Sequence, residues 1–154
     1  MKIICNGADL SDAVSKVYKA ASARTTNVIL EGIKLKAADG SLTLTATDLE
    51  LAIEKCIVAD VLIEGETVVP GRFFSEFVKK LTFDRIELSL TDANQLKIKY
   101  TDSEGMLQCM NPAEYPQIKE LGEAQAFTVA KKDFRDLVNK IAVSVMVDDA
   151  RPML

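Results

Sequence analysis

The chain has 154 residues and a net charge of −4, with 48% hydrophobic and 27% charged residues, a composition typical of folded globular proteins rather than disordered chains. No apolar run approaches the roughly 20 residues that span a bilayer, and residues 1–6 lack a signal-peptide core, so we expect a cytoplasmic protein without membrane contact. Histidine, the commonest general base and metal ligand, is absent, so we expect no catalysis, metal or cofactor.

The first part of the chain predicts a short strand, a helix and then a run of strands. Ile3 and Cys5 mark the first strand. Apolar residues at helical spacing predict a helix that begins near Asp9, its expected N-cap, and ends near residue 21. An Asp-Gly pair, Asp39 and Gly40, indicates a hairpin turn. Alternating residues predict further strands at 28–37, 42–47 and 51–57.

The second part of the chain again contains both predicted helices and predicted strands. Helical spacing of apolar residues predicts a second helix over 72–81 and a third from Lys131 to about residue 147. The segments 91–94 and 102–105 have turn composition. Strands are predicted at 86–90, 96–100 and 106–107. Many antiparallel strands with a few one-sided helices lying on one face indicate an α+β fold.

A linker and an internal repeat organise the chain. Residues 112–125 carry two prolines, a glycine and three glutamates, so we place a first domain at 1–116, a linker at 117–125 and a second unit from 126. Residues 9–17 resemble residues 133–141 at an offset of 124, and the preceding strand, Ile3 and Cys5, corresponds to Phe127 and Val129. The alternative is that two amphipathic helices look alike by chance.

If the repeat is real, the chain ends early in its second copy, at residues 126–154. A unit below about 40 residues rarely buries enough surface to fold alone. We therefore expect a fragment of a longer protein, in which this piece packs on the first domain or on a neighbouring chain. Exposure of Phe134, Leu137 and Ile141 together would contradict that packing.

The three cysteines are far apart, and each lies in an apolar or alternating stretch. They are Cys5, Cys56 and Cys109. Such cysteines are usually small core residues in a reducing compartment. We therefore predict that all three are buried and unpaired.

Positive charge gathers on the predicted helices. Residues 9–24, 71–81 and 131–147 carry net charges of +1, +2 and +2, while the rest of the chain carries −9. Basic side chains on helical faces can contact phosphates without reading bases, although lysines also simply solvate exposed helices. The sequence indicates no exposed aromatic and basic platform for stacking single-stranded bases.

Two other readings remain open. Asp48 and Glu50 could form a catalytic carboxylate pair, but they lie in an expected exposed turn and are better interpreted as shaping it. The chain could also be a protein-interaction module that uses its sheet edges and binds no nucleic acid.

Four segments carry a resemblance to one family, the beta subunit of bacterial DNA polymerase III, or sliding clamp. They are ADGSLTLTATDLE at 38–50, VPGRFF at 69–74, NPAEYP at 111–116 and DARPML at 149–154. The resemblance implies a clamp-type domain with two helices over antiparallel sheets, plus the beginning of a second copy. It implies a homodimeric ring that encircles duplex DNA and confers processivity on the replicative polymerase, without catalysis.

The resemblance also implies site residues. Arg24 and Arg72 match basic residues at the DNA-facing ends of the first and second helices. The other candidate DNA-binding residues are Lys16, Lys19, Lys79 and Lys80. Arg151 and Leu154 match the rim of a pocket for peptide motifs of the polymerase and the clamp loader, a pocket that is largely absent from this chain.

Overall fold

The computed structural model describes residues 1–22, 25–81, 85–118 and 127–145. The chain divides into two compact units, residues 1–118 and 119–154, and each is described by itself. The division falls inside the segment 117–125 that composition marks as a linker. The domain boundaries given by the repeat stay a prediction.

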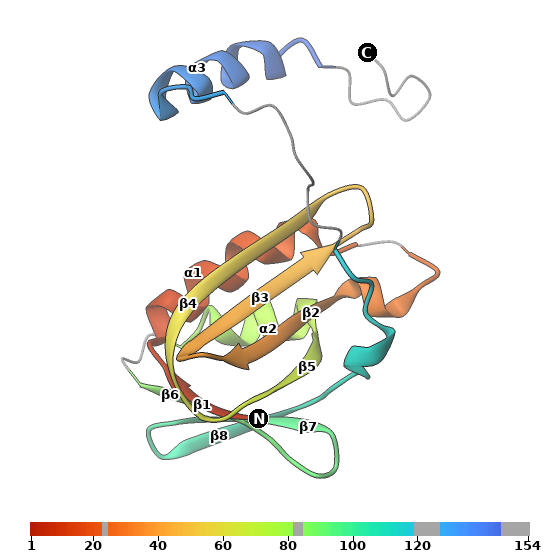
Figure 1. The fold of residues 1–154 in the computed structure, drawn as a ribbon, viewed down its shortest axis with the longest axis vertical. Helices are drawn as coiled ribbons and strands as arrows, with labels where there is room; N and C mark the ends of the chain where they lie inside the picture. The colour runs from red at the N-terminus through yellow and green to blue at the C-terminus, as the bar shows by residue number, and fades with distance from the viewer. Residues whose placement is uncertain (23–24, 82–84, 119–126, 146–154) are drawn as a thin grey trace. The chain divides into compact units, whose positions relative to one another are not determined.

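Eight antiparallel strands build the first unit (Figure 1). They are β1 (Lys2–Cys5), β2 (Gly32–Ala38), β3 (Ser41–Thr47), β4 (Ala52–Ile63), β5 (Gly65–Pro70), β6 (Ile86–Leu90), β7 (Gln95–Tyr100) and β8 (Ser103–Gln108). Their order in the sheet is β5-β2-β3-β4-β1-β6-β7-β8. The long β4 pairs with β3 through its first half and with β1 through its second half. A bridge between Val68 and Met110 nearly closes the sheet.

Two α-helices lie on one face of these strands. The helical segments of the first unit are α1 (Gly7–Val17), η1 (Tyr18–Ala20), η2 (Val28–Glu31), α2 (Gly71–Val78) and η3 (Pro112–Glu114). In Figure 1, α1 lies behind β3 and β4, α2 lies behind β2 and β5, and the two helices pack against each other. The predicted α+β fold is confirmed.

The first helix begins earlier than the sequence suggested. Its N-cap is Asn6, whose Oδ1 accepts hydrogen bonds from the amides of Ala8 at 2.8 Å and Asp9 at 3.2 Å. Asn is as good an N-cap as Asp, and the two residues between them, Gly7 and Ala8, do not oppose helix. The predicted cap at Asp9 is therefore wrong, and Asp9 instead contributes its charge to the first turn.

The apolar stripes of both helices form the core with the inward side chains of the strands. The fully buried members from the helices are Leu10, Ala13, Val14, Val17, Phe74 and Val78. On the strands, alternation places Leu35 and Leu44 inward and Lys36 outward. The period-two and period-3.6 patterns of the sequence thus meet in one core.

The hairpin turns differ in how well the sequence marks them. Asp39 and Gly40 both have positive φ, 48° and 69°, as the predicted hairpin turn requires. The turn between β7 and β8 consists of Thr101, whose φ is 46°, and Asp102, so only the first residue of the predicted turn 102–105 belongs to it. Gly105 pairs with Ile98 within β8, and a Cβ there would lie 2.7 Å from Cζ of Phe77.

Tyr115 anchors the segment that follows β8. Its hydroxyl donates to the carbonyl oxygens of Thr45 at 3.3 Å and Gly32 at 3.5 Å. Burial raises the pKa of Tyr115 to about 12. The ring packs with Ile29 and Val68 in a small second apolar cluster, which fixes the end of the first unit against its sheet.

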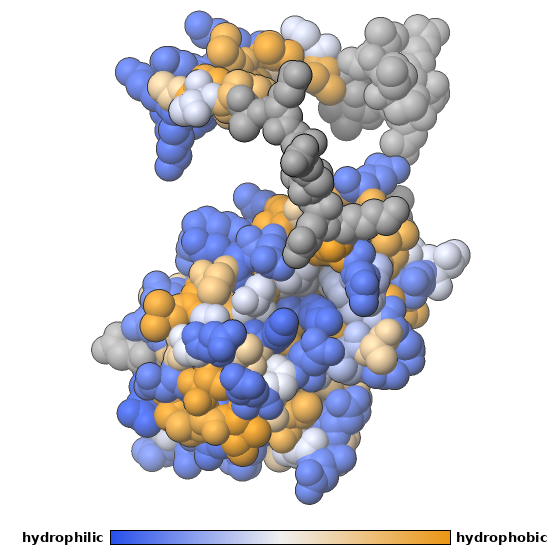
Figure 2. Space-filling model, in the orientation of Figure 1, coloured by the Kyte–Doolittle hydropathy of each residue, from blue (hydrophilic) through white to orange (hydrophobic). Residues whose placement is uncertain are grey.

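The second unit contributes one described helix, α3 (Lys131–Ala142), which buries none of its residues. Phe134, Leu137 and Ile141 are 57%, 54% and 62% exposed, and Figure 2 shows apolar side chains of α3 open at the surface. The burial expected of these three side chains is therefore absent from the described residues. The strand predicted at Phe127 and Val129 is also wrong, because residues 127–130 form no strand and lead directly into α3, where the carbonyl oxygen of Ala130 accepts a hydrogen bond from the amide of Phe134.

The predicted burial of the three cysteines is confirmed only in part. Cys5 and Cys109 are buried, but Cys56 is exposed, since it points outward from β4 with Glu54 and Val58. Alternation along a strand shows that successive residues point to opposite faces, but the sequence did not show whether Cys56 is on the buried or the exposed face. Burial, and then the charge of Asp9, raise the pKa of the Cys5 thiol to about 12.

We expect one thiol of the native protein to react quickly with a thiol-specific reagent, and that thiol is Cys56. Cys5 and Cys109 should react only after unfolding, because burial disfavours their thiolates. Counting labelled thiols by mass spectrometry checks this, with Cys56→Ser as the control. Rapid labelling of two or three sites in the native state would show that the core is open.

Candidate nucleic-acid interface

The solvent-facing sides of α1 and α2 carry exposed basic residues. Because each helix buries one apolar stripe on the strands, its remaining residues face away from the sheet. The exposed basic residues are Lys16 on α1, Lys19 on η1, Arg72 on α2, and Lys79 and Lys80 in the turn that follows α2. These five residues lie on or beside two helices that pack against each other, and they are called the basic face.

Two members of the basic face form ion pairs within their own helices. Lys16 Nζ lies 2.7 Å from Asp12 Oδ2, and Arg72 Nε lies 3.3 Å from Glu76 Oε1. The hydrogen bond from Lys16 holds the pKa of Asp12 below its ordinary value. Exposed pairs of this kind are weak and easily exchanged, so both cations stay available to another anion.

The cations of the strands are matched differently. Lys2, Lys34 and Lys97 each form an ion pair with a carboxylate on the neighbouring strand, and these carboxylates are Glu87, Glu66 and Glu104. In the described residues, no ion pair engages Lys19, Lys79 or Lys80. Lys36, Lys55 and Lys99 on the strands also lack an ion pair in the described residues, so ion pairing alone does not distinguish the helical cations from those of the sheet.

The structure places only part of the predicted site. Lys16, Lys19 and Arg72 lie on helical segments that contact one another, and Lys79 and Lys80 directly follow α2. Arg24, Arg151 and Leu154 lie outside the described residues, so their roles stay predictions. No group of three or more Cys, Asp or Glu side chains that could hold a metal ion occurs among the described residues, and no described helix is long and apolar enough to cross a membrane.

Asp48 shapes the turn between β3 and β4. Its Oδ1 accepts hydrogen bonds from the amides of Leu51 at 2.7 Å and Glu50 at 3.0 Å, around Leu49 at a φ of 81°. These bonds, the one from Leu51 first, hold the pKa of Asp48 below its ordinary value. Such an arrangement is that of a turn-forming carboxylate, because a general acid would need its pKa raised.

Asp48 should therefore contribute to stability above the pKa it has in the unfolded chain. Because its folded pKa is lower, this contribution is lost as the pH falls from about 4 through the folded pKa. We expect Asp48→Asn to flatten the loss of thermal stability on acidification, with Asp102→Asn, at another exposed turn, as the control. If Asp48→Asn and the unsubstituted chain lose thermal stability equally as the pH falls, that result would contradict this role.

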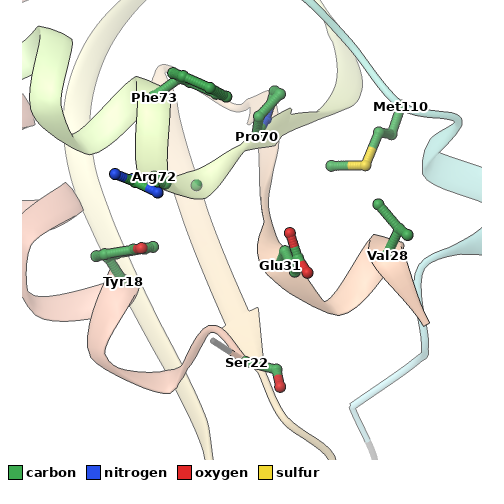
Figure 3. Close-up of a pocket in the computed structure, with 9 residues that line it drawn as sticks. Tyr18, Ser22, Val28, Glu31, Pro70, Arg72, Phe73 and Met110 are labelled. Carbon is green, nitrogen blue, oxygen red and sulfur yellow. The ribbon is translucent and has the colours of Figure 1, made fainter. Parts of the chain in front are cut away.

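A cavity of about 620 Å³ adjoins the basic face (Figure 3). Three segments that are distant in sequence form it: the end of α1 with Tyr18, the η2 region with Glu31, and the start of α2 with Arg72 and Phe73. Phe73 is 63% exposed, although the sequence placed it in the apolar stripe of the helix. The exposed ring of Phe73 beside Arg72 is a feature that the sequence did not indicate.

Comparison with known proteins gives a consistent result. The model of the family described as DNA polymerase III beta subunit, N-terminal domain, matches residues 1–119. The beta sliding clamp of Halalkalibacterium halodurans is 34% identical over 149 residues, which are 92% of this chain and 39% of that protein. The beta sliding clamp of Bacillus subtilis is 32% identical over 162 aligned residues, which are 100% of this chain and 43% of that protein.

Solved structures of sliding clamps are also similar to this chain. The DNA polymerase sliding clamp of Bacillus subtilis has a TM-score of 0.91 at 29% identity and covers 99% of this chain and 42% of its own. The DNA polymerase sliding clamp of Caulobacter crescentus has a TM-score of 0.90 at 25% identity and covers 98% of this chain and 41% of its own. The chain thus spans about 40% of the length of these relatives. It belongs to the family of the bacterial DNA polymerase III beta subunit, the sliding clamp, and contains that family's N-terminal domain.

Proposed function

We propose that this chain acts as the first part of a sliding clamp, which encircles duplex DNA and holds a replicative polymerase at the primer end. A closed ring cannot leave DNA sideways, so a bound polymerase keeps a high effective concentration there. Such a clamp catalyses no reaction. It needs weak contacts to phosphates, because tight ones would hinder sliding.

The basic face is the observation that carries this proposal. Five exposed cations lie on or directly beside the packed helices α1 and α2. Lysine and arginine side chains on a helical face suit non-specific contact with a phosphate backbone. We assign Lys16, Lys19, Arg72, Lys79 and Lys80 to that contact, together with Arg24 from the resemblance.

The domain organisation is proposed on the repeat: a first domain at 1–116, a linker at 117–125 and a second copy that begins at 126. Four positions of α3 correspond at the offset of 124 to buried positions of α1. The pairs are Leu10 with Phe134, Ala13 with Leu137, Val14 with Val138, and Val17 with Ile141. Because the α1 members pack on β3 and β4, we propose that the α3 members need equivalent strands of a complete second domain.

A ring also requires a surface where copies meet. β8 is the end strand of the sheet order and pairs only with β7 among the described strands, and Met106 on it is 53% exposed. An open strand edge can accept a strand from another chain. We therefore propose β8 as a contact of the homodimer. Peptides of the polymerase and clamp loader would bind elsewhere, at a pocket for which this chain supplies only Arg151 and Leu154.

The product of the intact gene tests the proposed function. We expect a homodimer that remains on closed circular duplex DNA after loading and is released when the circle is cut, because release then needs only sliding off an end. Retention on linear DNA equal to that on circles would contradict a topological clamp. A monomer with no dependence on DNA would favour the interaction module instead.

A further inference from the structure

We propose that the cavity beside Arg72 accepts one unstacked nucleobase of single-stranded DNA. The inference rests on the proposed function, since a clamp at a primer end lies next to single-stranded template. The cavity volume of about 620 Å³ is ample for one nucleotide. Its residues come from η1, η2, β5 and α2, together with Ser22 after η1 and Met110 after β8, all within the first unit.

The cavity wall offers aromatic and apolar surface for a base. Tyr18 and Phe73 supply rings, and Val28 and Met110 supply apolar side chains (Figure 3). Phe73 and Val28 are each 63% exposed, so this surface is open to a ligand. Stacking of one base on an aromatic side chain is worth roughly 5- to 150-fold in affinity and tolerates any sequence.

Two charged residues determine which part of a nucleotide enters. Arg72, whose side chain is 76% exposed, can contact a phosphate at the rim. Glu31 also lines the cavity and would repel a phosphate there, but its carboxylate can accept a hydrogen bond from the amino group of a base. The pair therefore orients the base inward and the phosphate outward. It also favours cytosine over thymine, which has no amino group.

Gly71 holds the two sides of the cavity close together. A Cβ at this position would lie 2.6 Å from the carbonyl oxygen of Glu31 and 3.1 Å from the ring of Tyr18. Only glycine therefore lets the start of α2 approach η1 and η2 this closely. The close approach places Arg72 and Phe73 beside Tyr18 and Glu31.

The position of Arg72 favours nucleic acid over a peptide as the occupant. Arg72 belongs both to the basic face and to the cavity, so a strand whose phosphates follow the basic face could turn one base into the cavity. A peptide would use the apolar wall but would gain nothing from the neighbouring cations unless it were acidic. Peptide binding is therefore the alternative that the experiments must distinguish from binding of a base.

The first experiment compares three labelled DNA probes by fluorescence anisotropy with the full chain. They are an oligo-deoxycytidine of about 12 nucleotides, an abasic strand of equal length and a blunt duplex, at about 50 mM salt. We expect the oligo-deoxycytidine to bind at least about 5-fold more tightly than the abasic strand. Equal binding of these two strands, or no binding of oligo-deoxycytidine, overturns the base site.

Variants separate the cavity from the basic face. Phe73→Ala should reduce oligo-deoxycytidine affinity to that of the abasic strand and leave duplex affinity unchanged. Leu62→Ala, at an apolar residue 57% exposed on β4, should change neither. If the unsubstituted chain binds oligo-deoxycytidine more tightly than the abasic strand but does not bind the duplex, that result would count against the proposed function alone. If Phe73→Ala instead abolishes binding of an acidic, leucine-rich peptide and spares DNA, the cavity is a peptide site and the proposal is overturned.

Photocrosslinking locates the base directly. An oligonucleotide with one 5-iodo-deoxycytidine should form its main adduct with Tyr18, Phe73 or Met110, read by mass spectrometry of the digested protein. Because the chain has three tyrosines and no tryptophan, quenching of tyrosine fluorescence, lost in Tyr18→Phe, gives a second readout. Adducts confined to the strands, or quenching that persists in Tyr18→Phe, would overturn the proposal.

Discussion

Phe74→Ala should destabilise the first unit by about 3–5 kcal/mol, the cost of truncating a fully buried phenylalanine. Phe74 has no exposed surface and joins the core between α2 and the strands. The substitution removes its burial and leaves a cavity that close-packed neighbours fill only in part. Urea unfolding followed by circular dichroism measures the change in the free energy of unfolding.

The neighbouring residue gives a matched control. Phe73→Ala makes the same chemical change one position earlier in the same helix, where the ring is 63% exposed. We expect a change within about 0.5 kcal/mol, as for other surface substitutions. Similar losses for both variants would mean that α2 does not pack on the strands through the face described above.

Duplex binding by the chain alone should be weak and steeply dependent on salt. If two or three cations of the basic face contact phosphates, the logarithm of the association constant falls with the logarithm of salt concentration at a slope of roughly −2 to −3. Affinity then drops about 16- to 64-fold between about 50 and 200 mM salt. Anisotropy titrations of a labelled duplex measure this slope.

Neutralising variants identify the cations involved. Lys79→Gln with Lys80→Gln should make the slope shallower by up to about 2. The control, Lys36→Gln with Lys99→Gln, removes the same charge from two exposed strand residues and should leave the slope unchanged. Tight, salt-resistant binding by the unsubstituted chain would refute the sliding contact, as would equal effects of the two pairs.

The sequence predicted those elements whose local signals agree with their tertiary surroundings. The stripe from Leu10 to Val17 and the alternating apolar residues of β3 each follow a single period, and these apolar residues are buried. An Asp-Gly pair, here Asp39 and Gly40, is strongly preferred in two-residue hairpin turns. Local chemistry and packing point to the same structure at these places.

Other features depend on contacts that no local pattern records. The strand β5 was not predicted, because its short apolar run ends at Pro70 and becomes a strand only by pairing with β2. Gly105 looked like a turn residue but is required by the approach of Phe77. Phe73 lies in a helical stripe of apolar residues, and only the path of α2 leaves its ring exposed.

The candidate site was predicted to a similar extent. Charge counting indicated that cations gather on helical segments, and α1, η1 and α2 do contact one another, while the role of their cations stays a proposal. The cavity beside Arg72 could not be predicted. It needs η1, η2 and α2 to converge, and the glycine that allows this, Gly71, looks in the sequence like an ordinary residue before a helix.

The basic face can be tested directly by nuclear magnetic resonance of the chain titrated with a short duplex at low salt. We predict chemical-shift changes at the amides of α1, η1 and α2 around Lys16, Lys19, Arg72, Lys79 and Lys80. The outward residues of β2 and β7, Lys36 and Lys99 among them, should stay unchanged. Changes centred on those strands, with the helices unaffected, would contradict a clamp whose helices face DNA.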